Sequence, residues 1–120
     1  MEKNAELIEK QNVLIVCQAN LNRSPTVEKF AKKYYSGEFN VKSAGIDYGY
    51  PNQINQELLD WADMVWVMDL IQYKDIESLF ERHPPVLVLG ISDQYDPDDP
   101  KLIDLLEWYF KKGKYDAKKN

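Results

Sequence analysis

The sequence predicts an α/β fold: a three-layer sandwich in which a four-stranded parallel sheet carries helices on both faces. Four short apolar runs alternate with longer amphipathic segments, and strands that alternate with helices form parallel sheets. In the run at residues 12–17 the apolar residues are consecutive, as in a strand that is buried on both faces. With 120 residues, of which 44% are hydrophobic, the chain is expected to form one domain spanning residues 1–120.

Strands are expected at residues 12–17, 39–43, 64–68 and 86–89. Residues 1–11 are a charged leader and residues 113–120 a lysine-rich tail, and both are expected to be peripheral. In parallel sheets, ligands bind at the carboxyl ends of the strands. The residue that ends the first strand, Cys17, is therefore expected at a ligand-binding edge.

Helices are expected from Pro25, over residues 53–60, over residues 71–80 and from Pro100. The first has Ser24 as its predicted N-cap, an apolar stripe that reaches Tyr34, and a left-handed Gly37 just past its end. The last has Asp99 as its predicted N-cap, followed by a proline in the first turn. Apolar spacing also predicts three core tryptophans: Trp61, Trp66 and Trp108.

Composition and charge argue against several classes of protein. The net charge of −5 and the pI near 4.9 do not suit a nucleic-acid partner, which requires a basic face. No apolar run approaches the roughly 18–20 residues that span a bilayer, and the first six residues are too charged for a signal peptide. The lone cysteine excludes an internal disulfide and fits a reducing cytoplasm. A cytoplasmic protein with no membrane or nucleic-acid partner is therefore expected.

Cofactor signals are missing from the sequence as well. No cluster of histidine, cysteine and acidic residues has metal-ligand spacing, and the glycines form no nucleotide-binding loop. Neither a metal nor another cofactor is expected.

Cys17 and Arg23 stand at the two ends of a polar turn between the first strand and the first helix. A guanidinium can donate two hydrogen bonds to one phosphate group, and backbone amides beside a helix N-terminus attract anions and favour a thiolate. Ser24 can donate its hydroxyl to that thiolate when it acts as a leaving group. The expected phosphate-binding residues are Gln18, Ala19, Asn20, Leu21, Asn22, Arg23 and Ser24. The alternative is that Cys17 is an inert core residue.

This turn resembles that of the low-molecular-weight protein tyrosine phosphatase family, whose signature is a strand followed by Cys-x5-Arg-Ser-Pro. Residues 17–25 carry that motif. The Ser-Ala-Gly of residues 43–45 and the Val-Met-Asp of residues 67–69 resemble the family's second and third strand endings. The resemblance implies that Cys17 is the nucleophile and that Asn20 braces the loop through side-chain hydrogen bonds.

Three features depart from the family pattern. Ala19 stands where the loop usually has glycine, and Asn22 replaces the second loop cysteine of many members. The region after Gly45 is also short, and substrate preference is usually set there.

The general acid is expected in the acidic loop between residues 90 and 99. The family places an aspartate in an Asp-Pro-aromatic motif, which protonates the leaving oxygen. Asp93 is followed two residues later by Tyr95 but lacks the proline, whereas Asp96 has the proline but lacks the aromatic. We favour Asp93 and keep Asp96 as the alternative. Tyr48 and Tyr95 are candidate walls of the substrate pocket.

These features predict a cysteine-dependent phosphatase that hydrolyses phosphomonoesters without metal, through a phosphocysteine intermediate. The family resemblance implies that it is a protein tyrosine phosphatase. The expected partners are a phosphorylated protein or a small aryl phosphate, with inorganic phosphate as product and inhibitor. Two alternatives stay open. One is a noncatalytic module that binds phosphate or a phosphoprotein. The other is an arsenate reductase that uses an external thiol, because the chain has no second cysteine for an internal relay.

Overall fold

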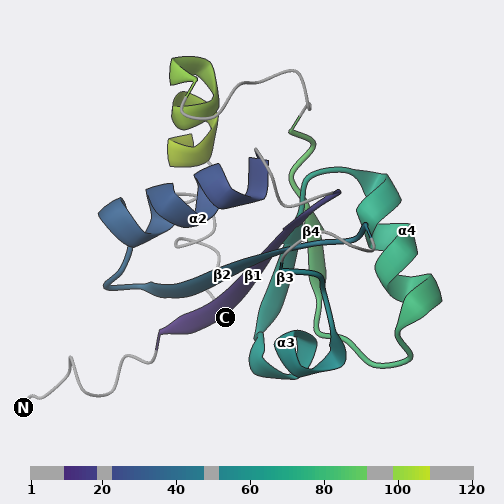
Figure 1. Cartoon of the computed structure of the whole chain (residues 1–120). Coiled ribbons are helices and arrows are strands. Elements are labelled where there is room, and N and C mark those ends of the chain that lie inside the picture. The colour runs from purple at the N-terminus through teal and green to yellow at the C-terminus, as the bar shows by residue number, and fades with distance from the viewer. Residues whose placement is uncertain (1–9, 19–22, 48–51, 92–98, 109–120) are drawn as a thin grey trace, which may run out of the picture.

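Four parallel strands form the central sheet of the computed structural model (Figure 1), which describes residues 10–18, 23–47, 52–91 and 99–108. The strands are β1 (Gln11–Cys17), β2 (Phe39–Gly45), β3 (Met64–Val67) and β4 (Val86–Val88). Their order in the sheet is β2-β1-β3-β4, and every neighbouring pair is parallel. The predicted four-stranded parallel sheet is confirmed.

Helices cover both faces of this sheet, as predicted. They are α2 (Arg23–Tyr34), α3 (Gln56–Trp61), α4 (Leu70–Leu79) and a further helix over residues 100–108. The buried hydrophobic residues of α2 and of the helix at 100–108 belong to one cluster, and those of α3 and α4 belong to another. Among the described residues, no helix is long and apolar enough to cross a membrane.

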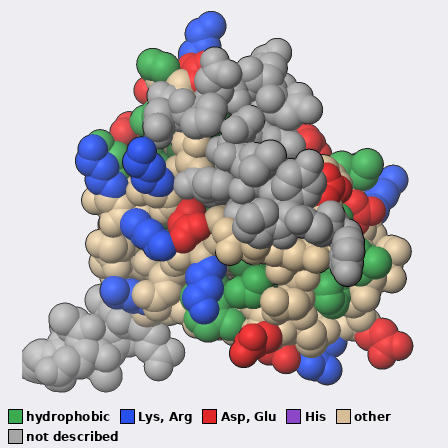
Figure 2. Space-filling view, in the orientation of Figure 1, with side chains coloured by type: hydrophobic (Ala, Val, Ile, Leu, Met, Phe, Trp, Pro, Cys, Tyr) green, Lys and Arg blue, Asp and Glu red, His purple; other side chains and the backbone are tan. Residues whose placement is uncertain are grey.

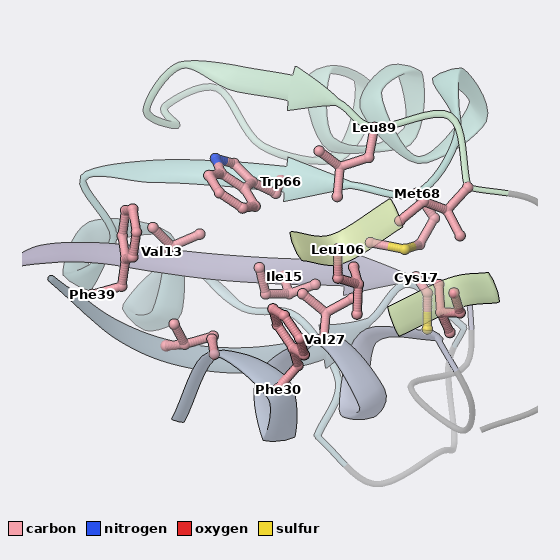
Figure 3. Packing of buried hydrophobic residues seen from close by; sticks show 14 residues of the cluster. Val13, Ile15, Cys17, Val27, Phe30, Phe39, Trp66, Met68, Leu89 and Leu106 are labelled. Atoms are coloured by element: carbon pink, nitrogen blue, oxygen red, sulfur yellow. The ribbon is translucent and has the colours of Figure 1, made fainter. Parts of the chain in front are cut away.

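The central strand β1 contributes side chains to both clusters. Successive side chains of a strand point to opposite faces, so a strand between two helical layers must be apolar at every position. Figure 3 shows Val27 of α2 and Leu106 packed around Ile15 on one face. The buried residues of β1 alternate between the α2 face (Val13, Ile15, Cys17) and the α3–α4 face (Leu14, Val16).

The outer edge of β2 is basic. Figure 2 shows basic side chains gathered over the α2 and β2 side of the molecule. Lys10, Lys32 and Lys42 line one hollow beside the strand, and the Lys42 ammonium lies 4.5 Å from the ring centre of Trp61. The predicted core residue Trp61 is thus only half-buried. Charged side chains on an edge strand discourage pairing with another sheet.

The ends of α2 differ from the sequence prediction. The helix begins at Arg23, so Ser24 lies within its first turn and the prediction of Ser24 as N-cap is wrong. The backbone φ of Gly37 is not positive, so the predicted left-handed cap is also wrong. Instead, the Tyr35 carbonyl accepts N–H groups from Glu38 at 3.0 Å and Phe39 at 2.9 Å. This turn leads directly into β2 without a left-handed residue.

Helix α3 begins later than expected, at Gln56 instead of residue 53. Asn55 is its N-cap, and its side-chain oxygen accepts the backbone N–H of Leu58 at 2.8 Å. Gln53 forms an isolated parallel bridge with Gly45 at the end of β2 instead. The cap and the bridge together shorten the helix.

Two aromatic residues that were predicted to be buried are exposed. Trp66 is buried, as expected, but Tyr34 is 59% and Trp108 is 56% exposed. Tyr35 packs against the cluster in place of Tyr34. Trp108 follows the buried Leu106 by two residues, which is about 200° around a helix, so it points away from the sheet.

Candidate active site

Cys17 is the last residue of β1 and lies at the carboxyl edge of the sheet. It pairs in register with Gly45 of β2, and its carbonyl accepts the N–H of Ile46 at 3.1 Å. The side chain is 3% exposed and belongs to the cluster on the α2 face (Figure 3). The strand order changes direction beside β1, and ligands of open α/β sheets bind at such a point. The structure thus puts the predicted nucleophile at the edge where ligands collect.

The N-terminus of α2 follows Cys17 closely in the chain. Residues 18–22 connect the end of β1 to Arg23, where the 12-residue helix begins. Val27, in the early part of this helix, is buried in the same cluster as Cys17. A helix N-terminus carries a partial positive charge that favours anions. The fold therefore brings this positive helix end to the edge where β1 ends.

Several predicted site residues lie outside the described part of the chain. They are Ala19, Asn20, Leu21 and Asn22 of the loop, the side chains of Arg23 and Ser24, the candidate acids Asp93 and Asp96, and the candidate pocket walls Tyr48 and Tyr95.

Gln18 is the residue of the predicted loop whose contacts the structure describes. Its side-chain Nε2 donates to Asp47 Oδ1 at 2.6 Å, and the backbone N–H of Asp47 donates to the Gln18 carbonyl at 2.7 Å. Its side-chain Oε1 accepts a hydrogen bond from Gln72 Nε2 at 3.1 Å. The start of the loop is thus fixed to the segments that follow β2 and β3.

Gln72 is a polar residue that sequence reasoning missed. Its side chain is buried at 1% exposure in the first turn of α4, and its Oε1 accepts the backbone N–H of Asp69 at 2.7 Å. This contact is half of a capping box, in which the third residue of a helix reaches back to the N-cap. The Asp-x-x-Gln spacing of residues 69–72 was the available signal for it.

The loop that carries the candidate acids departs from the same edge of the sheet. Ile91 is 1% exposed, and its N–H donates to the Met68 carbonyl at 2.9 Å, beside the end of β3. The chain is described again at Asp99, whose side chain accepts the N–H of Lys101 at 2.8 Å. The predicted N-cap of the last helix is confirmed. Asp93 is two residues beyond Ile91 in the sequence.

Resolved pKa shifts are found on surface pairs of α3, α4 and the segment before β4. The hydrogen bond from Arg82, with a further one from Gln56, holds the pKa of Asp60 below its ordinary range. The hydrogen bond to Glu77 raises the pKa of Tyr73. Among the described residues, no group of three or more His, Cys, Asp and Glu side chains is arranged to hold a metal ion.

Solved structures of low-molecular-weight phosphatases share this fold. The tyrosine phosphatase Wzb from Escherichia coli K30, in complex with phosphate, matches with a TM-score of 0.70 and 19% identity, over 90% of this chain and 99% of that protein. The low-molecular-weight protein tyrosine phosphatase from T. tengcongensis matches with a TM-score of 0.66 and 22% identity, over 86% and 99%. The YwlE arginine phosphatase from Geobacillus stearothermophilus matches with a TM-score of 0.61 and 20% identity, over 88% and 96%.

These likenesses identify the fold. No protein-family model matches the sequence, and no curated protein matches it either. The chain has the fold of the low-molecular-weight protein tyrosine phosphatases. The shared fold supports the resemblance to this family that the sequence indicated.

Proposed function

We propose that this protein is a phosphomonoesterase in which Cys17 is the nucleophile and no metal takes part. The observation that carries the proposal is the position of Cys17 at the carboxyl end of the central strand, directly before the loop that leads to the N-terminus of α2. An anion at that position is stabilised by the helix end, and a thiolate there is stabilised in the same way. The shared fold with solved phosphatases supports the proposal.

In the first step, the Cys17 thiolate attacks phosphorus in line with the leaving oxygen. The S–P bond forms as the P–O bond breaks, while the Arg23 guanidinium and the loop amides hold the charge of the transferring group. Asp93 gives its proton to the leaving oxygen, which departs as an alcohol or phenol. Asp96 is the alternative acid.

In the second step, water hydrolyses the phosphocysteine. The carboxylate formed in the first step takes a proton from the attacking water, and the S–P bond breaks to release inorganic phosphate. The Ser24 hydroxyl donates a hydrogen bond to the departing thiolate. The cycle thus ends with the enzyme in its starting protonation state.

The proposed substrate is phosphotyrosine in a protein, with Tyr48 and Tyr95 as walls for its ring. Structural neighbours include an arginine phosphatase as well as tyrosine phosphatases, so the N–P bond of phosphoarginine is the competing substrate to measure. A nucleophile that depends on a reduced thiol suits the reducing cytoplasm.

The test is hydrolysis of p-nitrophenyl phosphate in EDTA by wild type, Cys17→Ser, Asp93→Ala and Asp96→Ala. We expect Cys17→Ser to lose more than about a thousandfold in kcat, and Asp93→Ala to lose about a hundredfold. A larger loss in Asp96→Ala than in Asp93→Ala transfers the acid role to Asp96. Full activity in Cys17→Ser would refute the mechanism.

Two further outcomes identify the alternative functions. A wild-type protein that binds phosphate without turnover is a noncatalytic phosphate-binding module. Reduction of arsenate that requires an added thiol, without phosphatase activity, identifies an arsenate reductase.

A further inference from the structure

A chain of side-chain amides crosses the carboxyl edge of the sheet beside Cys17. The backbone N–H of Asp69 donates to Gln72 Oε1 at 2.7 Å, and Gln72 Nε2 donates to Gln18 Oε1 at 3.1 Å. Gln18 Nε2 then donates to Asp47 Oδ1 at 2.6 Å. The chain therefore links the start of α4, the residue after Cys17 and the segment after β2.

The donor-to-acceptor direction of these hydrogen bonds is set by the groups at both ends. A side-chain amide accepts at one end and donates at the other, whereas a carboxylate only accepts. The Asp69 N–H requires an acceptor, so Gln72 turns its amide nitrogen toward Gln18. Asp47 requires a donor, so Gln18 turns its own nitrogen the opposite way. Gln72 is 1% exposed, and a buried polar group that loses its partner is costly.

Gln18 is held through its backbone as well as its side chain. Its carbonyl accepts the Asp47 N–H at 2.7 Å, and the preceding carbonyl, that of Cys17, accepts the N–H of Ile46 at 3.1 Å. These contacts fix the peptide from which the proposed phosphate-binding loop departs. Oriented peptide groups are what such a loop offers to an anion.

We propose that Gln72, Gln18 and Asp47 are positioning residues for the proposed oxyanion site, and that they set its affinity for phosphate. The inference rests on the proposed function, because it assumes that residues 18–24 bind an oxyanion. It assigns a role to two residues outside the phosphatase signature motif, Asp47 and Gln72. Asp47 and Gln72 act through Gln18 and need not touch the substrate themselves.

The inference can be tested by reversing the donor-to-acceptor direction of these hydrogen bonds. Gln72→Glu still accepts the Asp69 N–H but cannot donate to Gln18. Gln18 then lies between two carboxylates with a single amide nitrogen, so one contact is lost whichever way its amide points. Adding Asp47→Asn supplies a donor at the other end, so Gln18 can donate to Glu at position 72 and accept from Asn at position 47.

Alkylation of Cys17 by iodoacetamide, followed by mass spectrometry, measures the affinity of the site for phosphate without relying on turnover. Cys17 is the only cysteine, and inorganic phosphate bound at the loop protects it. We expect Gln72→Glu to raise the phosphate concentration for half-protection about tenfold, the effect of one lost hydrogen bond to a buried partner. The double variant Gln72→Glu/Asp47→Asn returns to within about twofold of wild type, because the two changes are coupled through Gln18.

The matched control is Gln56→Glu, the same substitution in the first turn of α3. Gln56 also makes two side-chain hydrogen bonds, to Asp60 and to the Arg82 carbonyl. We expect no change in its phosphate protection. Thermal unfolding of every variant shows whether it is folded, and Gln18→Met, which removes the middle link without adding charge, replaces Gln72→Glu if that variant does not fold.

The outcomes separate the inference from the function on which it rests. If phosphate does not protect wild-type Cys17 from alkylation, both the proposed oxyanion site and this inference are refuted. Protection of wild type that is unchanged in Gln72→Glu or Gln18→Met overturns the inference alone. If Gln72→Glu weakens protection by phosphate and the double variant does not restore it, the inference is also overturned. That result would indicate a loss of packing, which Asp47→Asn cannot reverse. Protection without turnover leaves the inference supported and the proposed catalysis refuted.

Discussion

Replacement of Leu106 by alanine tests how the last helix is held on the sheet. Leu106 is 0% exposed and packs in the cluster that contains Ile15 and Cys17 (Figure 3). Leu→Ala in a core costs roughly 2.7–5.0 kcal/mol, because the lost transfer free energy adds to the cost of the cavity. We take about 3.5 kcal/mol as the central value for this site.

The expected shift in melting temperature follows from the size of the domain. An unfolding entropy of about 2.1 cal/mol/K per residue gives roughly 250 cal/mol/K for this chain of 120 residues. The loss of about 3.5 kcal/mol then lowers Tm by roughly 14 °C.

The matched control is Leu79→Ala in α4, where the side chain is 61% exposed. A surface change of this kind alters stability by less than about 0.5 kcal/mol, or roughly 2 °C. Scanning calorimetry of the two variants and wild type at one protein concentration gives the comparison. Equal shifts in the two variants, or a shift below about 4 °C for Leu106→Ala, would show that residues 100–108 do not pack on the sheet as described.

Three further predictions concern local stability. Asn55→Ala removes the α3 cap and lowers Tm by about 4 °C, whereas Asn55→Asp keeps the acceptor and has little effect; equal losses in both would exclude capping. Gly90→Ala lowers the free energy of unfolding by about 1–2 kcal/mol through backbone strain alone, because Gly90 has a φ of 73° and an added Cβ has no atom within 4 Å. Gly37→Ala, at an ordinary φ, is neutral or stabilising by up to about 1 kcal/mol. Urea unfolding measures both variants, and a neutral Gly90→Ala would contradict the left-handed backbone. Because Arg82 lowers the folded-state pKa of Asp60, their pair stabilises the protein above the unfolded-state pKa of Asp60 and loses that contribution as pH falls through the lower folded-state value. Asp60→Asn abolishes this component in unfolding curves measured across acid pH at low salt, and an unchanged pH dependence in that variant would rule out the pair as its source.

The sheet could be predicted because its strands have a direct sequence signal. β1 is apolar at successive positions since both of its faces are covered, and that pattern distinguishes it from the amphipathic helices. The N-cap at Asp99 was also readable, because an aspartate followed by proline is a local signal for a helix start.

The contacts of the site could not be predicted from the sequence in the same way. Gln18 meets Asp47 and Gln72, which are 29 and 54 residues away in the sequence. These meetings depend on the parallel register that brings the ends of β1, β2 and β3 to one edge. The exposure of Trp108 could not be predicted either, because the last helix has apolar residues on more than one face and the sequence does not show which face packs on the sheet.

The most direct test of the account is whether a phosphoryl group is transferred to Cys17. p-Nitrophenolate is a weakly basic leaving group that departs without a general acid, whereas the second step requires the Asp93 carboxylate. Asp93→Ala, mixed with p-nitrophenyl phosphate and quenched within the first turnover, therefore accumulates the phosphocysteine. We predict that peptide mass spectrometry then finds one phosphoryl group on the peptide that contains Cys17, and none in Asp93→Ala/Cys17→Ser. Turnover by wild type with no phosphocysteine at any quench time, or a phosphoryl group on another residue, would contradict it.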